Sequence, residues 1–331
     1  MKLPLTVLAI LFLLVSPFLG SSLIEPLSLL SLSPADPQNI IFWHLRVPRT
    51  IVAFMSGAIL SLAGASFQAI FHNPLASPYT LGVSSGSALG AALYISAGWE
   101  ISWLILPGST ACALFAAICT LLLLYALIRK ASHYSPTTLL LGGVVISFFC
   151  ASTILFVQFI ADASKVFEIS RWMMGSLANL TLKDSALLLP FFILAIVSSW
   201  KSAAELDLIT VGEDFALGKG VDVERVIFEQ LIMLSLATAG VVSVCGPIGF
   251  VGIIVPHICR ALVGHSHKTL LYSVAVFGGI FLVASDAIAR LLILPFEIPA
   301  GVITSMIGGP FFLYVLFFSS THGEVTKALD T

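Results

Sequence analysis

The chain has 331 residues, of which 58% are hydrophobic and only 10% carry a charge. Soluble globular proteins carry roughly 25% charged residues, so this composition excludes an ordinary soluble domain. The formal net charge of −2 argues against nucleic acid as a partner. Apolar segments recur along the whole length, and no polar segment is long enough for a second domain. The composition therefore predicts one integral membrane domain that covers residues 1–331.

Ten apolar segments, separated by polar residues or by proline and glycine, predict an all-α fold with about ten membrane-spanning helices. Their bounds are Leu3–Leu23, Val47–Phe71, Leu81–Ala97, Trp103–Ile128, Pro136–Ile160, Ser185–Trp200, Ile227–Cys245, Phe250–Val263, Leu270–Leu291 and Gly301–Phe318. Phe250–Val263 is short, so we expect it to be tilted, extended by its flanks or partly re-entrant. The first segment also fits a secretory signal peptide, but it is longer than a usual signal core, and we favour an uncleaved helix.

The basic residues predict how these helices are oriented. With ten spans both termini share one side, and that side holds nine lysines and arginines against six on the other. This modest bias predicts that both termini are cytoplasmic. Arg46, Arg49 and Arg290 then lie on the outer side, each beside the mouth of a span. They indicate either an acidic external partner or ordinary snorkelling of arginine at the membrane interface.

Two short segments echo each other along the chain. Leu60–Gly64 (LSLAG) and Leu236–Gly240 (LATAG) each precede a break that contains proline. Their spans run in opposite directions under this topology, as in transporters built from inverted repeats. Five small or apolar residues can match by chance, so the echo only supports an inverted-repeat fold.

Small residues in the second span predict close helix packing. Gly57 and Gly64 lie on one face of Val47–Phe71, where they let a neighbouring helix approach. The span ends at a polar break that contains Asn73 and Pro74 and predicts a turn.

The third span opens with Gly82-Val-Ser-Ser-Gly86, which matches the pattern of a serine nucleophile elbow. That mechanism needs a strand-to-helix turn together with histidine and acid partners. Here the pentapeptide opens an apolar helix, so we interpret Gly82 and Gly86 as a packing surface. An intramembrane serine hydrolase that uses Ser84 with His257 is the alternative.

The largest polar loop is Lys201–Arg225, on the predicted cytoplasmic side. It mixes apolar positions with charges and glycines, which predicts one or two short amphipathic helices joined at glycine and facing a soluble partner. A solvated connector is the plainer interpretation, although loops longer than about 12–15 residues usually have a role. The Gly-Lys pair in this loop lacks the spacing and the hydroxyl residue of a nucleotide-binding loop, so we predict no ATP site.

The remaining polar residues of interest are histidines and one acid. His257, His265 and His267 meet zinc-ligand spacing poorly, so we predict no metal and no cofactor, and we expect His265 and His267 to be solvated. Asp286 lies inside a predicted span, where charges are costly. Arg290, four residues later, predicts a local ion pair. A proton-coupled carrier would bury more such groups than this sequence offers.

Several stretches together resemble a known family. They are RVPR, GAILSLAGASFQAIFHNPLASPYTLGVSSGSALGAA, GPIGFVGIIVPHICRALVGHSHK and ASDAIARLLILPFEIPAGVITSMIGGPFFLYVLF. They resemble the permease family of ABC importers for iron-siderophores, cobalamin and haem, from about Arg46 to Phe317. The resemblance implies a ten-helix subunit similar to the vitamin B12 importer permease, in the cytoplasmic (inner) membrane of a prokaryote. It also implies a homodimer or heterodimer, two cytoplasmic ATPase subunits, and a periplasmic or lipid-anchored binding protein.

The resemblance also implies roles for particular residues. It places Arg46, Arg49 and Arg290 at the surface where the binding protein docks. It places the cytoplasmic coupling helices, which contact the ATPase, in the loop 201–226, at Gly212, Glu213, Ala216, Gly220 and Val221, with Lys219 where leucine is usual. We expect packing or path-lining roles for Gly57, Gly64, Gln68, Asn73, Pro74, Gly82, Gly86, Pro256 and His257.

The expected function is import of a metal chelate, most simply iron(III)-siderophore, by alternating access. Cobalamin, haem or an oxyanion such as molybdate are alternatives within this class. A transport subunit of this kind performs no covalent chemistry. The serine hydrolase and an ion-coupled secondary carrier are the alternatives from other classes.

Overall fold

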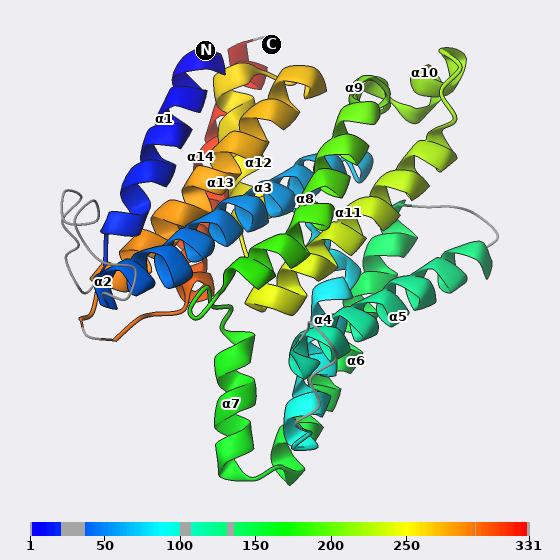
Figure 1. Cartoon of the computed structure of the whole chain (residues 1–331). Coiled ribbons are helices and arrows are strands. Elements are labelled where there is room, and N and C mark those ends of the chain that lie inside the picture. The colour runs from blue at the N-terminus through cyan, green and yellow to red at the C-terminus, as the bar shows by residue number, and fades with distance from the viewer. Residues whose placement is uncertain (1, 21–36, 100–106, 131–135, 295, 330–331) are drawn as a thin grey trace.

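The computed structural model describes residues 2–20, 37–99, 107–130, 136–294 and 296–329 as a helical bundle (Figure 1). The helices are α1 (Lys2–Val15), α2 (Pro37–Ile40), α3 (Val47–Ile70), α4 (Val83–Ser96), α5 (Gly108–Lys130), α6 (Pro136–Ile160), α7 (Ala163–Met173), α8 (Leu182–Lys201), α9 (Ala203–Val211), α10 (Glu213–Gly218), α11 (Val223–Cys245), α12 (Val251–Val263), α13 (His267–Leu291) and α14 (Ala300–Leu329). Three short helical turns join them: η1 (Ser16–Phe18), η3 (Ile41–Arg46) and η4 (Pro78–Leu81).

Each of the ten predicted spans contains a helix, although their number as membrane crossings is not confirmed. In the first span, Leu3–Leu23, α1 ends at Val15, and residues 21–23 lie outside the described part of the chain. Within the described residues, six helices are long and apolar enough to cross a membrane. They are Pro37–Ile70, Gly108–Ala126, Thr138–Ile160, Leu182–Lys201, Val223–Cys245 and His267–Leu291. The start of the predicted span Trp103–Ile128 lies partly outside the described residues. The sequence analysis did not predict helix α7. Its segment contains charged residues and only one buried apolar residue, Ile169, so no apolar run marks it.

Helix α3 is the centre of the bundle, and its small residues are the reason that its neighbours come so close. It packs against α8, α11, α12 and α13. A Cβ atom built on Gly64 would lie 1.8 Å from the backbone oxygen of Gly252 in α12. A Cβ atom on Gly57 would lie 2.1 Å from the oxygen of Gly278 in α13. The predicted close approach is thus confirmed, with backbone touching backbone at two levels.

The GVSSG segment also packs closely. A 3₁₀ turn, η4, precedes α4, and Gly82, with φ of 78°, is the N-cap residue between them. A Cβ atom on Gly86 would meet the Thr120 hydroxyl of α5 at 2.0 Å. Because no strand precedes the serine in this segment, the nucleophile elbow is not formed.

The bundle has two distinct ends. Both termini lie at the same end as α9 and α10, at the top of Figure 1. The opposite end carries α2 and α7. We call the first the α9–α10 end and the second the arginine end, for the residues described next.

Candidate functional site

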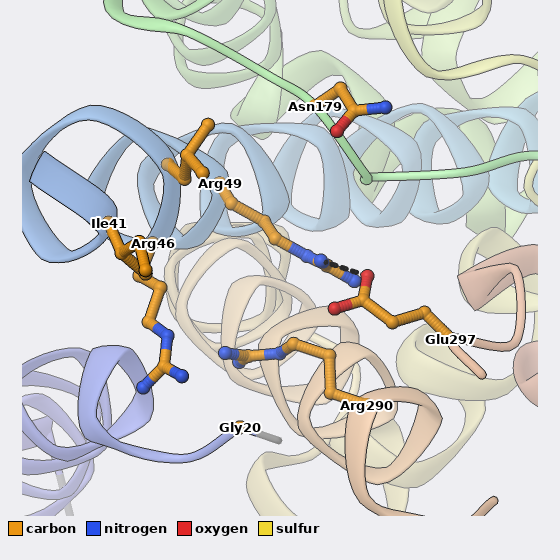
Figure 2. A pocket seen from close by; sticks show the side chains of 8 residues that line it. Gly20, Ile41, Arg46, Arg49, Asn179, Arg290 and Glu297 are labelled. Carbon is orange, nitrogen blue, oxygen red and sulfur yellow. Dashed lines mark hydrogen bonds and ion pairs between the residues drawn. The ribbon is translucent and has the colours of Figure 1, made fainter. Parts of the chain in front are cut away.

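The three arginines for which the sequence predicts a docking role line one cavity of about 210 Å³ at the arginine end (Figure 2). Arg46 and Arg49 come from the long continuous helix Pro37–Ile70, and Arg290 comes from the last turn of α13. The cavity is lined by Gly20, Ile41, Leu45, Arg46, Arg49, Asn179, Arg290 and Glu297. Snorkelling keeps a charged head in water, whereas these arginines are only 7%, 8% and 3% exposed. The snorkelling interpretation is therefore wrong.

Arg49 and Asp286 form the centre of a buried ion-pair network. The Arg49 guanidinium donates to the Asp286 carboxylate from Nε at 3.0 Å and from Nη2 at 2.8 Å. Its Nη1 donates to Glu297 at 2.7 Å, as the dashed line in Figure 2 marks. Arg290 Nε lies 3.1 Å from the other Asp286 oxygen, which confirms the predicted local pair. Paired charges of this kind are the form in which ionised groups tolerate burial.

The turn η1, which follows α1, holds two of the cavity's arginines through hydrogen bonds. Arg46 donates to the carbonyl oxygens of Pro17 and Phe18 at 3.2 and 3.3 Å. Arg290 donates to the Ser16 hydroxyl at 3.2 Å. In Figure 2 the guanidinium groups of Arg46 and Arg290 point toward each other beside Gly20.

Three guanidinium groups and the Glu297 carboxylate line this space, and the buried Asp286 carboxylate pairs with Arg49 and Arg290. Counted together in their ionised forms, these five groups leave a net charge of +1. Glu297 was missed by the sequence analysis, although it lies within the EIPAG segment just after Arg290. Its partner, Arg49, is 248 residues away in the sequence, and no local spacing predicts such a contact. The geometry is suited to one further carboxylate.

The predicted helix pair in the polar loop is present at the opposite end. Helices α9 and α10 meet at Gly212, whose φ of 156° permits the sharp joint. Ala216 is buried, whereas Gly220 is exposed. Val211, Phe215 and Leu217 are 70%, 47% and 57% exposed. This short segment therefore exposes three large apolar side chains beside charged residues.

His267 is not solvated, and that prediction is wrong. Its side chain is 3% exposed, and Nδ1 lies 2.7 Å from Asp207 Oδ1 of α9. The helix begins three residues earlier than the predicted span Leu270–Leu291, so His267 is the first residue of α13. His265 is exposed, as expected.

The remaining predicted residues divide between packing and the surface. Gln68 is buried in α3 and donates to the Gly252 oxygen at 3.2 Å, while Arg260 donates to its Oε1. Asn73 caps its own turn by accepting from the Leu75 amide at 2.9 Å. Pro74 is exposed and Pro256 is buried inside α12. His257 is half-buried, with its ring 6.0 Å from that of Phe311 in α14. Among the described residues, no hydrogen bond joins Ser84 to His257.

Within the described residues, a bundle with six helices long and apolar enough to cross a membrane indicates an integral membrane protein. The chain belongs to the FecCD transport family, whose model matches residues 7–318.

The relatives agree with this class. The chain is 33% identical over 316 residues to the hemin transport system permease protein of Yersinia pestis, covering 93% of each chain. It is 37% identical over 281 residues to the cobalamin import system permease protein of Halobacterium salinarum, covering 85% of this chain and 74% of the other. A solved metal-chelate type ABC transporter in an inward-facing conformation aligns with a TM-score of 0.82 at 30% identity, covering 96% and 98% of the two chains. The chain is therefore a transport subunit and not an enzyme, and the alternative prediction of an intramembrane serine hydrolase is wrong.

Proposed function

We propose that this chain is the single-domain permease of an importer for metal chelates, with iron(III)-siderophore as its cargo. The names of its relatives support the chelate class: they include hemin, cobalamin and, in Bacillus subtilis, Fe(3+)-citrate import permeases. Haem, cobalamin and an oxyanion such as molybdate are the competing cargoes. An iron(III)-hydroxamate retained by the cognate binding protein would support this cargo, and a retained corrinoid would contradict it.

The proposed mechanism is alternating access in a homodimer or heterodimer of permeases. Two ATPase subunits bind the α9–α10 end through Gly212, Glu213, Ala216, Gly220 and Val221. That end, with both termini, is then cytoplasmic, and the arginine end faces the periplasmic or lipid-anchored binding protein. The path lies between the two permease copies, and the half-buried His257 beside α14 is our candidate for its lining.

One observation carries the docking part of this proposal. The net-positive cavity of Arg46, Arg49 and Arg290 lies at the end opposite the exposed helix pair. A carboxylate from the binding protein that enters it would form charge-assisted hydrogen bonds with preplaced guanidinium groups. Because the arginines are already held by Asp286, Glu297 and the carbonyls of η1, little side-chain entropy is lost when the carboxylate binds.

The test is the affinity of the purified complex for its binding protein. Arg46→Gln removes one charge and leaves the buried Arg49–Asp286 pair in place, and glutamine can still donate to the carbonyls of Pro17 and Phe18. We expect the dissociation constant to rise at least about tenfold, since loss of a charge-assisted contact typically costs 1.5–3 kcal/mol. Arg171→Gln, an exposed residue of α7 at the same end, is the matched control and should change it little. Equal affinities for wild type and Arg46→Gln would contradict the docking role.

A further inference from the structure

Helix α9, where the ATPase is proposed to bind, is fastened to two other helices by histidines. His72, just after the end of α3, donates from Nε2 to the Ile209 carbonyl of α9 at 3.0 Å. Asp207 of α9 accepts from the His267 amide of α13 and lies equally close to its ring Nδ1, both at 2.7 Å. Helix α9 is therefore tied both to the end of α3 and to the start of α13.

Both links satisfy backbone groups that a helix cannot satisfy by itself. The last four carbonyls of a helix lack intrahelical partners, and the Ile209 carbonyl is one of them. The first amides of a helix are likewise unpaired, and Ser266, at the N-cap of α13, supplies no side-chain bond. The Asp207 carboxylate takes that place and also matches the positive end of the α13 dipole. Each link caps the end of one helix with a side chain from another segment. If α9 moved alone, the Ile209 carbonyl and the His267 amide would lose these partners.

The same two helices carry the arginine network at their far ends. Arg49 lies in the first turn of α3, and Asp286 and Arg290 lie in the last turns of α13. Between the ends, a Cβ atom on Gly278 of α13 would fall 2.6 Å from the Gly57 oxygen of α3. With about 1.5 Å of rise per residue, helices of 24 and 25 residues span the bilayer core. Helices α3 and α13 are thus connected by the arginine network at one end, by backbone contact in the middle and through α9 at the other end.

His72 has a second unusual feature. Its φ is 46°, a left-handed conformation that a residue other than glycine seldom adopts. Strain of this kind persists where surrounding contacts hold the residue in place, and it is frequent at functional sites. The bond to Ile209 is such a contact.

We propose that His72 and the Asp207–His267 pair are positioning residues that transmit movement of α9 to α3 and α13, and so to the arginine cavity. This rests on the proposed function, because it takes α9 as the ATPase contact and the cavity as the docking site for the binding protein. Nucleotide on the ATPase then changes the affinity of the distant cavity for the binding protein through two parallel links.

The experiment measures that coupling directly. The complete importer is reconstituted in lipid nanodiscs, and the dissociation constant of fluorescently labelled binding protein is measured without nucleotide and with a non-hydrolysable ATP analogue. The ratio of the two constants is the coupling between the ends. We expect His72→Ala and Asp207→Ala each to bring the ratio at least about threefold closer to one. The double variant should bring it close to one, while the nucleotide-free constant stays near that of wild type.

Four further variants separate transmission from folding. His72→Gln keeps a donor for the carbonyl and Asp207→Asn keeps an acceptor for the amide, so both should retain most of the ratio. His267→Gln removes only the ring contact and gives a milder second measurement if an alanine variant does not assemble. His265→Ala, an exposed neighbour, is the control and leaves the ratio unchanged.

The outcomes distinguish this inference from the proposed function. If the double alanine variant assembles with the ATPase and keeps the wild-type ratio, the transmission role is wrong. If the wild-type complex binds its partner equally with and without nucleotide, there is no coupling for these residues to transmit, and the inference is wrong while the proposed function stands. If the chain does not assemble with an ATPase, the proposed function itself is wrong.

Discussion

Glu297 occupies part of the space that an incoming carboxylate would use. Its side chain is 39% exposed and accepts a hydrogen bond from Nη1 of Arg49 at 2.7 Å. Asp286 accepts from Nε and Nη2 of the same guanidinium and is buried, with its side chain 2% exposed. The buried acid fixes Arg49 in place, whereas the exposed acid competes with a partner for the same hydrogen-bond donor.

Glu297→Gln should therefore tighten docking of the binding protein. The substitution raises the net charge of the cavity from +1 to +2 and weakens the competing contact. Because partly exposed ion pairs contribute about 0.2–1 kcal/mol, we expect the dissociation constant to fall by up to about fivefold. The gain should appear mainly in the association rate and should shrink at high salt.

Glu168→Gln is the control for this measurement. Glu168 lies on α7 at the same end and is 59% exposed, so the substitution makes the same change in total charge away from the cavity. An equal gain in both variants would show a general charge effect instead of competition at Arg49.

At the scale of helices, the close contact between α3 and α12 depends on the absence of one methyl group. Gly64→Ala places a carbon atom 1.8 Å from the Gly252 oxygen, so the two backbones must separate. Overpacking of this kind typically costs about 1–3 kcal/mol. We expect a lower melting temperature of the purified protein in detergent and a smaller monodisperse fraction.

Gly309→Ala in α14 is the matched control. Nothing lies within 4 Å of a Cβ atom at that position, and alanine favours a helix over glycine by about 0.8–1.0 kcal/mol. Its melting temperature should equal or exceed that of wild type. If Gly64→Ala behaved in the same way, the backbone contact would not limit stability.

At the scale of the molecule, the two ends present opposite chemistry. The arginine end holds buried charges in a cavity, and the α9–α10 end exposes Phe215 and Leu217. An aromatic residue on a short helix is suited to a pocket in a partner, where buried aromatic anchors supply much of the binding energy.

Phe215→Asp should reduce copurification of the ATPase subunit at least about tenfold, because loss of an aromatic anchor commonly costs 2 kcal/mol or more. The matched control is Phe167→Asp in α7, which is 69% exposed at the opposite end and should leave copurification unchanged. Both variants place a charge at an exposed position, so general misfolding would affect them alike. Loss of the ATPase from both would contradict a specific contact at α10.

The sequence was sufficient for features that depend on local periodicity. Apolar runs placed the helices, and the charges and glycines of Lys201–Arg225 predicted one or two short helices joined at a glycine, which the structure identifies as Gly212. Contacts between segments far apart in the chain could not be predicted from the sequence. The partners of Arg49 are 237 and 248 residues away, and Asp207 reaches His267 across 60 residues. No spacing rule distinguishes a histidine that caps a remote helix from one that faces water.

The contacts Gly57–Gly278 and Gly64–Gly252 have a further consequence. Side chains normally separate two helices and allow small sliding movements through changes of rotamer. Where backbones touch, that freedom is absent, because interiors of this density resist displacement. Helices α3, α12 and α13 should therefore keep their mutual arrangement and turn together as one rigid body. Any change of shape during a transport cycle has to be taken up at the boundary of this three-helix unit.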